Sequence, residues 1–97
     1  MNDIDKIENL VNEINSRDQE LKDYQSMKIE ELSDEIQKII STQYETIQRI
    51  EELELKGTRS DLIKYAKMSC RNSTERRIAQ IQKIYFDKID IKYGNHK

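Results

Sequence analysis

The fold of this chain is decided by residues 27–55, which read MKIEELSDEIQKIISTQYETIQRIEELEL. Apolar side chains recur there at alternating steps of three and four residues, which is the spacing of one face of an α-helix. The members of this face are Ile29, Leu32, Ile36, Ile39, Ile40, Tyr44, Ile47, Ile50 and Leu53. We therefore expect one helix over residues 27–55, about 40 Å long at about 1.5 Å per residue.

Both ends of this expected helix carry boundary signals. Ser26 is a good N-cap residue, because its hydroxyl can accept a hydrogen bond from a free backbone N–H of the first turn. Gly57 follows the last apolar residue and suits the left-handed conformation in which many helices end.

A helix this long cannot be covered by an independent globule of 97 residues. We expect it to pack against the C-terminal part of the chain with one side left over for a partner. The residues assigned to long-helix packing are Ile36, Ile40, Tyr44, Ile47 and Ile50. Gln43 and Thr46 fall where a strict coiled coil would place apolar residues, so a helical bundle is favoured over a two-stranded coil.

Shorter helices are predicted on both sides of the long one. Residues 3–15 carry apolar side chains on one helical face, and Asp3 is their expected N-cap. Residues 16–20 contain no apolar side chain and are interpreted as a polar connection or a frayed helix end. A short helix is predicted over residues 61–69, with Ser60 as its N-cap.

A final helix is predicted over residues 74–93, where Ile and Tyr again follow helical spacing. Asn72 and Glu75 have the spacing of a capping box, which predicts a break before this helix. The chain is therefore expected to form a single all-α domain over residues 1–97. Its architecture is a helical bundle with one long central helix and a long C-terminal helix.

The composition supports the all-α prediction. The chain has no proline and only two glycines, whereas strands and tight turns usually leave such residues every 8–12 positions. Hydrophobic residues make up 35% and charged residues 37% of the chain, so the core is thin and the surface is highly charged. Such a chain tends to need partner subunits to complete its burial.

The charge is unevenly distributed along the chain. The net charge of −2 argues against bulk affinity for nucleic acid, which needs an excess of bases. Acidic residues dominate up to residue 55, and basic residues dominate from residue 56 to residue 97. An intramolecular or intersubunit charge match is the favoured interpretation, and a DNA-facing basic patch is the alternative.

The sequence predicts no catalytic, cofactor or metal site, and hence no enzyme. Cys70 has no cysteine or histidine neighbour for zinc, and the single histidine, His96, is next to the last residue. Acidic residues are abundant on the long helix, but their spacing is that of a solvated face. They are Glu30, Glu31, Asp34 and Glu35.

The compartment is expected to be reducing, because a single cysteine excludes an internal disulfide. The N-terminus has no basic and apolar run of the kind found in signal peptides. No stretch approaches the ~18 consecutive apolar residues of a membrane span.

One segment carries more specific information. Residues 57–63 read GTRSDLI and follow the long helix, residues 71–72 read RN, residues 76–77 read RR, and residues 92–94 read KYG. This order resembles the first Psf subunit of the GINS complex, a eukaryotic DNA-replication assembly. Lys64 departs from the family pattern, which has proline there, and Ile91 replaces an aromatic residue. The resemblance covers only the helical domain, since the small β-rich second domain of the family would follow Gly94.

The resemblance implies a non-catalytic, nuclear subunit of the GINS heterotetramer. That assembly bridges the Mcm ring and the Cdc-forty-five factor in the CMG replicative helicase and helps to dock the leading-strand polymerase. Contact with DNA would be indirect or weak, and no membrane or cofactor is involved. The residues expected to form the structural motif and interface are Arg59, Ser60, Asp61, Leu62, Ile63, Arg71, Arg76, Arg77, Tyr85 and Tyr93.

Two other functions fit the same residues. One is a helical subunit of another assembly, of kinetochore, tethering or Mediator type. The other is a weak nucleic-acid binder that uses the basic C-terminal half. Within the motif, Leu62 and Ile63 are expected to enter the core, and Arg59 is expected to pair with a nearby carboxylate.

Overall fold

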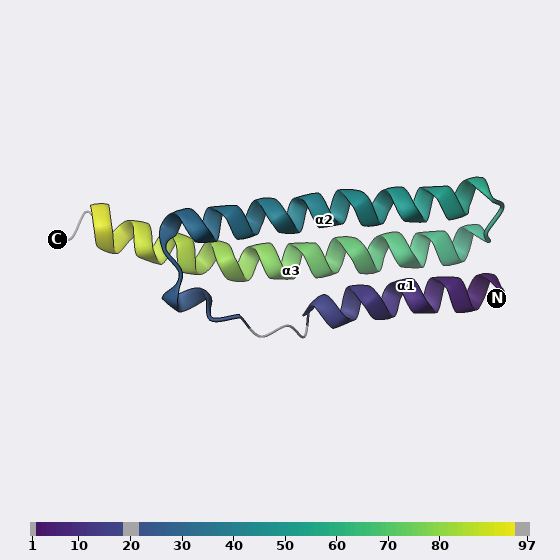
Figure 1. Ribbon diagram of the computed structural model, residues 1–97, viewed down its shortest axis with the longest axis horizontal. Coiled ribbons are helices and arrows are strands. Elements are labelled where there is room, and N and C mark those ends of the chain that lie inside the picture. The colour runs from purple at the N-terminus through teal and green to yellow at the C-terminus, as the bar shows by residue number, and fades with distance from the viewer. Residues whose placement is uncertain (1, 19–21, 95–97) are drawn as a thin grey trace.

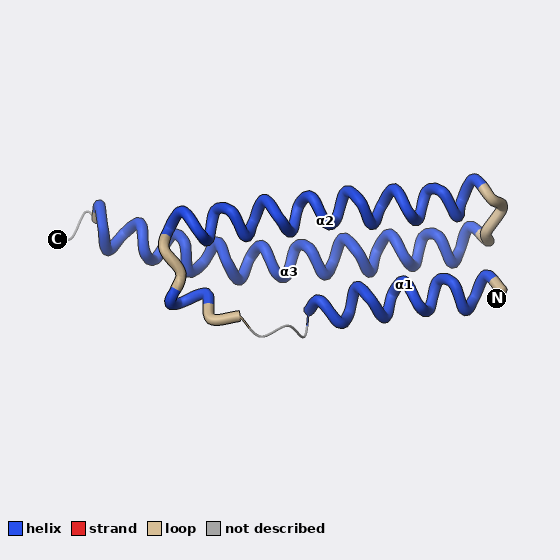
Figure 2. The backbone as a smooth tube through the Cα atoms, in the orientation of Figure 1, coloured by secondary structure: helices blue, strands red, loops and turns tan. Residues whose placement is uncertain are grey.

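The computed structural model describes residues 2–18 and 22–94, and within them it is all-helical with no strand. The α-helices are α1 (Asp3–Asp18), α2 (Ile29–Leu55) and α3 (Ser60–Tyr93), and a short 3-10 turn, η1 (Tyr24–Ser26), precedes α2. They form a long, narrow bundle of 58 × 20 × 18 Å (Figures 1 and 2). The predicted all-α bundle with two long helices is confirmed.

The three helices lie side by side with their axes nearly aligned (Figure 1). Helix α2 runs opposite to α1 and α3, and the backbone of α1 lies closer to α3 than to α2. The C-terminal turns of α3 extend past the start of α2 (Figure 1). None of the helices in the described ranges is long and apolar enough to cross a membrane.

The core consists of two clusters that follow one another along the bundle. The first joins α1 to the loop-proximal halves of α2 and α3, and its buried members are Ile7, Leu10, Val11, Ile14, Ile50, Ile63, Ala66 and Cys70. The second joins η1 to the other halves of α2 and α3, and its buried members are Tyr24, Leu32, Ile39 and Ile81. Helix α1 therefore covers only one half of the α2–α3 pair.

The three predicted N-caps are each displaced by one or two positions. Asn2 rather than Asp3 caps α1, because its Oδ1 accepts the backbone N–H of Asp5 at 2.8 Å. Lys28 is the N-cap of α2 and Arg59 that of α3. Ser26 belongs instead to η1, where its hydroxyl donates to the side chain of Asp23.

The end of α2 follows the prediction closely. Gly57 has a φ of +90°, the left-handed conformation that favours glycine. The N–H of Gly57 donates to the carbonyl of Glu54 at 3.0 Å, and that of Thr58 donates to Leu53 at 3.1 Å. This pair of bonds is the Schellman motif, which satisfies the last free carbonyls of a helix. It turns the chain directly into α3.

The predicted break near residues 72–75 is wrong, because α3 is continuous from Ser60 to Tyr93. The Thr74 hydroxyl donates to the carbonyl of Cys70 at 2.9 Å, so this hydroxyl is satisfied inside the helix. Ser73 and Thr74 are both buried, while Asn72 faces solvent. The two predicted helices, 61–69 and 74–93, are therefore one helix, since burial of the small residues outweighs a weak local capping signal.

Helix α1 also extends further than predicted, to Asp18 rather than residue 15. The Ser16 hydroxyl donates to the carbonyl of Asn12 at 2.8 Å. Arg17 reaches across to α2, where its Nη1 donates to the Thr46 hydroxyl at 2.9 Å. Polar contacts thus hold the added turn, and the remainder of the predicted connection, residues 19–20, lies outside the described residues.

Candidate protein-binding surfaces

The predicted packing stripe of α2 is divided between core and solvent. Ile50 is fully buried, and Ile36 and Ile47 pack at the edges of the two clusters. Ile40 is 43% exposed and Tyr44 is 67% exposed. Both ends of the stripe therefore contact the core, while its middle lies on an open side of the bundle, so packing of Ile40 and Tyr44 on a partner stays a prediction.

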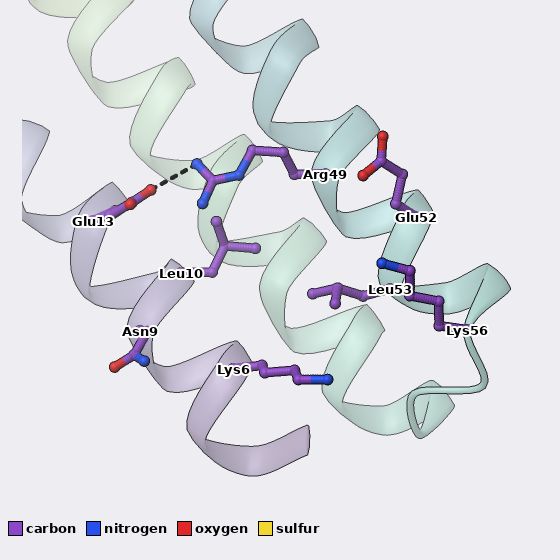
Figure 3. Close-up of a pocket in the computed structure, with 8 residues that line it drawn as sticks. All are labelled: Lys6, Asn9, Leu10, Glu13, Arg49, Glu52, Leu53 and Lys56. Carbon is purple, nitrogen blue, oxygen red and sulfur yellow. Dashed lines mark hydrogen bonds and ion pairs between the residues drawn. The ribbon is translucent and has the colours of Figure 1, made fainter. Parts of the chain in front are cut away.

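Helix α1 lies on the opposite side of α2. Arg17 of α1 binds Thr46, and Glu13 Oε2 pairs with Arg49 Nη1 at 2.7 Å (Figure 3). Successive residues of a helix are about 100° apart, so Ile40 and Tyr44 lie about 120–180° around the axis from Thr46 and Arg49. Nothing in the described chain covers the side that carries Ile40 and Tyr44.

Helix α3 has a second open apolar line. Its buried residues Ala66 and Cys70 contact the cluster that contains α1. On the opposite side are four large apolar side chains that are each more than half exposed, namely Tyr65, Met68, Phe86 and Tyr93. Both α2 and α3 therefore carry exposed apolar side chains on the side that faces away from α1.

The motif after α2 forms the turn at one end of the bundle. Ile63 is buried in the first cluster and Leu62 packs against it, as predicted. Arg59 pairs with Asp61 itself, with 2.8 Å between Nη2 and Oδ2. Ser60 is exposed and is the first residue of α3 rather than its cap. The motif therefore contributes Leu62 and Ile63 to the core and the Arg59–Asp61 ion pair to the surface.

The start of α1 lies beside this turn. Asn2, Asp3 and Ile4 line a shallow cavity together with Arg59. Leu55, the last residue of α2, is 88% exposed at the same end of the bundle. The turn thus presents apolar and charged side chains together at a free end.

The other predicted site residues do not gather at the turn. Arg71 and Arg76 are exposed along α3, whereas Arg77 is half-buried. Tyr85 packs against the second cluster, and its ring lies in an edge-to-face arrangement with that of Phe86, with 5.6 Å between the ring centroids. Tyr93 is exposed near the far end of α3. The predicted residues are therefore spread along a surface and do not form a single pocket.

A cavity of about 290 Å³ separates α1 from α2 (Figure 3). Leu10 and Leu53 point into the space between the helices, and the charged side chains lie around them. The charged and polar lining residues are Lys6, Asn9, Glu13, Arg49, Glu52 and Lys56. The Glu13–Arg49 pair closes one side of this cavity.

A second cavity, of about 250 Å³, lies where α1, α2 and α3 meet. It is lined by Arg17, Lys22, Glu35, Lys38, Ile39, Thr42 and Arg77. Its carboxylate, Glu35, is only 8% exposed, so the prediction that Glu35 belongs to a solvated face is wrong. Lys22 Nζ at 3.0 Å and Lys38 Nζ at 3.4 Å hold the two carboxylate oxygens.

The Glu35 contacts predict a pH-dependent contribution to stability. Burial raises the pKa of Glu35, but the two lysines outweigh burial and lower it below the ordinary 4.5. The stabilisation is therefore present above pH 4.5 and is lost as pH falls through the lowered pKa. We expect Glu35→Gln to lower the free energy of unfolding by about 1 kcal/mol at pH 7.

The measurement is urea unfolding followed by circular dichroism at several pH values. The difference between Glu35→Gln and wild type should shrink as the pH falls below 4.5. Glu45→Gln is the matched control, since Glu45 is exposed on the same helix. A difference that stays constant down to acidic pH would contradict a contribution from the ionised carboxylate.

Cys70 is a packing residue in this fold. It is buried in the first cluster, and burial raises the pKa of its thiol. A raised pKa reduces the thiolate fraction and therefore the reactivity of the sulfur. Within residues 2–18 and 22–94, His, Cys, Asp and Glu side chains form no group of three that could hold a metal ion.

Known protein families, curated proteins and solved structures were compared with this chain, and none of them matches it.

Proposed function

We propose that this protein is a non-catalytic scaffold subunit that assembles with other proteins through its long helices. The observation that carries the proposal is the open side of the α2–α3 pair, where Ile40, Tyr44, Met68 and Phe86 are exposed. Single exposed apolar residues are common on protein surfaces. Apolar side chains that follow one side of two adjacent long helices are the kind of surface that protein partners cover.

The specific assembly that we propose is the GINS heterotetramer of the nuclear CMG helicase. Its support is the resemblance of residues 57–63 to the first Psf subunit. The geometry of that motif is compatible with an interface role, because Arg59 and Asp61 are both 63% exposed and add little to a monomer's stability. The Mcm ring, the Cdc-forty-five factor and the leading-strand polymerase would then be neighbours of the assembled complex.

The proposal is tested by purifying the tagged chain from its native cells and identifying the proteins that accompany it. Recovery of three small helical subunits related to one another would support GINS. A different set of helical proteins would favour the alternative of another assembly. Recovery of the chain alone would contradict a scaffold role.

A pair of matched variants tests the motif itself. The double variant Arg59→Ala/Asp61→Ala should lose the partner proteins while the helical content of the purified chain is unchanged. The control is Arg49→Ala/Glu13→Ala, which removes another exposed ion pair, with side chains 52% and 51% exposed. Equal loss of partners in both variants would show that the motif has no special role.

A further inference from the structure

The exposed residues of α3 follow a heptad pattern on the side that faces away from α1. We define the outer seam as Tyr65, Met68, Asn72, Glu75, Ala79, Gln82 and Phe86, which alternate in steps of three and four. Every one of these seven residues is exposed. Ile89 and Tyr93 continue the same register toward the end of the helix. Steps of three and four over this length are the spacing by which two helices pack along a shared seam.

Four of the seven positions that flank the outer seam are basic, and the other three are Ser69, Ile78 and Tyr85. In heptad notation, Lys64 and Arg71 lie at g positions on one side, and Arg76 and Lys83 lie at e positions on the other. All four are exposed. The only acidic residue between positions 64 and 86 is Glu75, which lies within the seam itself. Flanking charges of this kind select the partner helix in coiled coils.

We propose that the outer seam of α3 binds an amphipathic helix of a partner protein whose flanking positions are acidic. The partner would place apolar side chains on Tyr65, Met68 and Phe86 and carboxylates beside the flanking cations. This inference rests on the proposed scaffold function and adds the chemistry of one partner.

A second copy of this chain does not fit the seam. In a parallel pair of helices, each g position faces the e position five residues later on the other helix, which places Arg71 against Arg76. The like charges opposed in the parallel pair are destabilising. In an antiparallel pair that overlaps the whole seam, Lys64 lies beside Tyr85 and Arg71 beside Ile78, so these cations gain no carboxylate. Charge complementarity therefore selects an acidic helix.

The middle of the seam makes the contact selective. Asn72, Glu75 and Gln82 are polar and exposed, so a purely apolar partner surface would leave them without hydrogen bonds. A polar residue at a seam position fixes register at a cost in affinity. The partner is thus expected to be polar opposite the middle of the seam and apolar opposite its two ends.

Nucleic acid is the competing class of ligand for these cations. It is disfavoured because Tyr65, Met68 and Phe86 lie between the cations and have no complement on a phosphate backbone. The net charge of the chain is also negative, at −2. Phosphate contacts need a basic excess, which makes DNA the weaker candidate.

The test uses two synthetic 28-residue helical peptides. Both carry the same seam, which consists of Leu residues except for one Asn and one Gln at its centre. One carries Glu at all e and g positions, and the other carries Lys there. Binding of each labelled peptide to the full chain is measured by fluorescence anisotropy at 50 and 300 mM NaCl. We expect the Glu peptide to bind at least tenfold more tightly than the Lys peptide at low salt, with the ratio falling at high salt.

Charge-reversal variants locate the binding site. Arg71→Glu/Lys83→Glu should abolish the preference between the two peptides, because it leaves two cations and two carboxylates at the flanking positions. The control Lys6→Glu/Lys56→Glu changes two exposed lysines beside the α1–α2 cavity and should leave the preference unchanged. Circular dichroism establishes that both variants are as helical as wild type.

Several outcomes would overturn the proposal. Equal binding of the two peptides would show that the flanking cations do not select a partner. Tighter binding of a 20-base-pair DNA duplex than of the Glu peptide, abolished by Arg71→Glu/Lys83→Glu, would assign the seam to nucleic acid. Recovery of the same native partners by wild type and by Arg71→Glu/Lys83→Glu would refute the seam but leave the scaffold function standing.

Discussion

Replacing Asn72 with proline is expected to lower the free energy of unfolding by about 3 kcal/mol or more. Asn72 lies in the interior of α3 and its side chain faces solvent. Proline at this position removes one backbone hydrogen bond, and its ring clashes with the carbonyl four residues earlier. The loss would be a large part of the stability of a domain this small. The measurement is thermal and urea unfolding followed by circular dichroism.

The matched control is Asn72→Ala, which also removes the side chain but keeps the backbone N–H. Alanine is the better helix former, so this variant should be as stable as wild type or slightly more stable. The two variants together decide between a continuous α3 and two helices with a break at residues 72–75. Similar stabilities for the proline and alanine variants would show that a break exists.

Replacing Ile50 with alanine is expected to cost about 2–5 kcal/mol of unfolding free energy. Ile50 is fully buried in the cluster where α1, α2 and α3 meet. Removing three of its carbon atoms loses the transfer free energy of those atoms and leaves a cavity. Because the cluster joins all three helices, the loss should appear as lower cooperativity as well as a lower midpoint in urea.

Ile40→Ala is the control, since it makes the same chemical change on the same helix at a residue that is 43% exposed. We expect it to cost less than about 1 kcal/mol in the isolated chain. If Ile40 packs on a partner, the same variant should weaken assembly although it hardly affects folding. Equal destabilisation by both variants would contradict the assignment of Ile50 to the core and of Ile40 to the open side of α2.

The periodicity of residues 27–55 was sufficient to predict the fold class and the extent of α2 nearly to its ends. Helical spacing is a direct consequence of burying one face, so a long amphipathic helix is visible in its own sequence. The turn at Gly57 was also predictable, because a left-handed residue after a helix is a local property. Ile63 was recognised as a core residue because it is an apolar residue in the first turn of a predicted helix, which is also a local property.

The remaining differences involve residues whose environment is set by distant parts of the chain. Ser73 and Thr74 look like helix breakers locally, but α3 buries them and stays helical. Glu35 looks like one of several solvated acids, but it is buried and pairs with Lys22, which lies outside α2. The exposure of Tyr44 depends on how many helices surround α2. A helical-wheel projection of α2 alone does not contain that information.

The tight turn between α2 and α3 has a consequence for how the chain folds. The two longest helices are neighbours in sequence and are joined by a short turn. We expect their first contacts to form beside Gly57, where little loop entropy is lost, and the later contacts to form progressively further from it. Helical proteins dominated by such local contacts fold in microseconds to milliseconds. The hairpin of α2 and α3 should therefore form early, and α1 should dock on it afterwards as a separate, slower step.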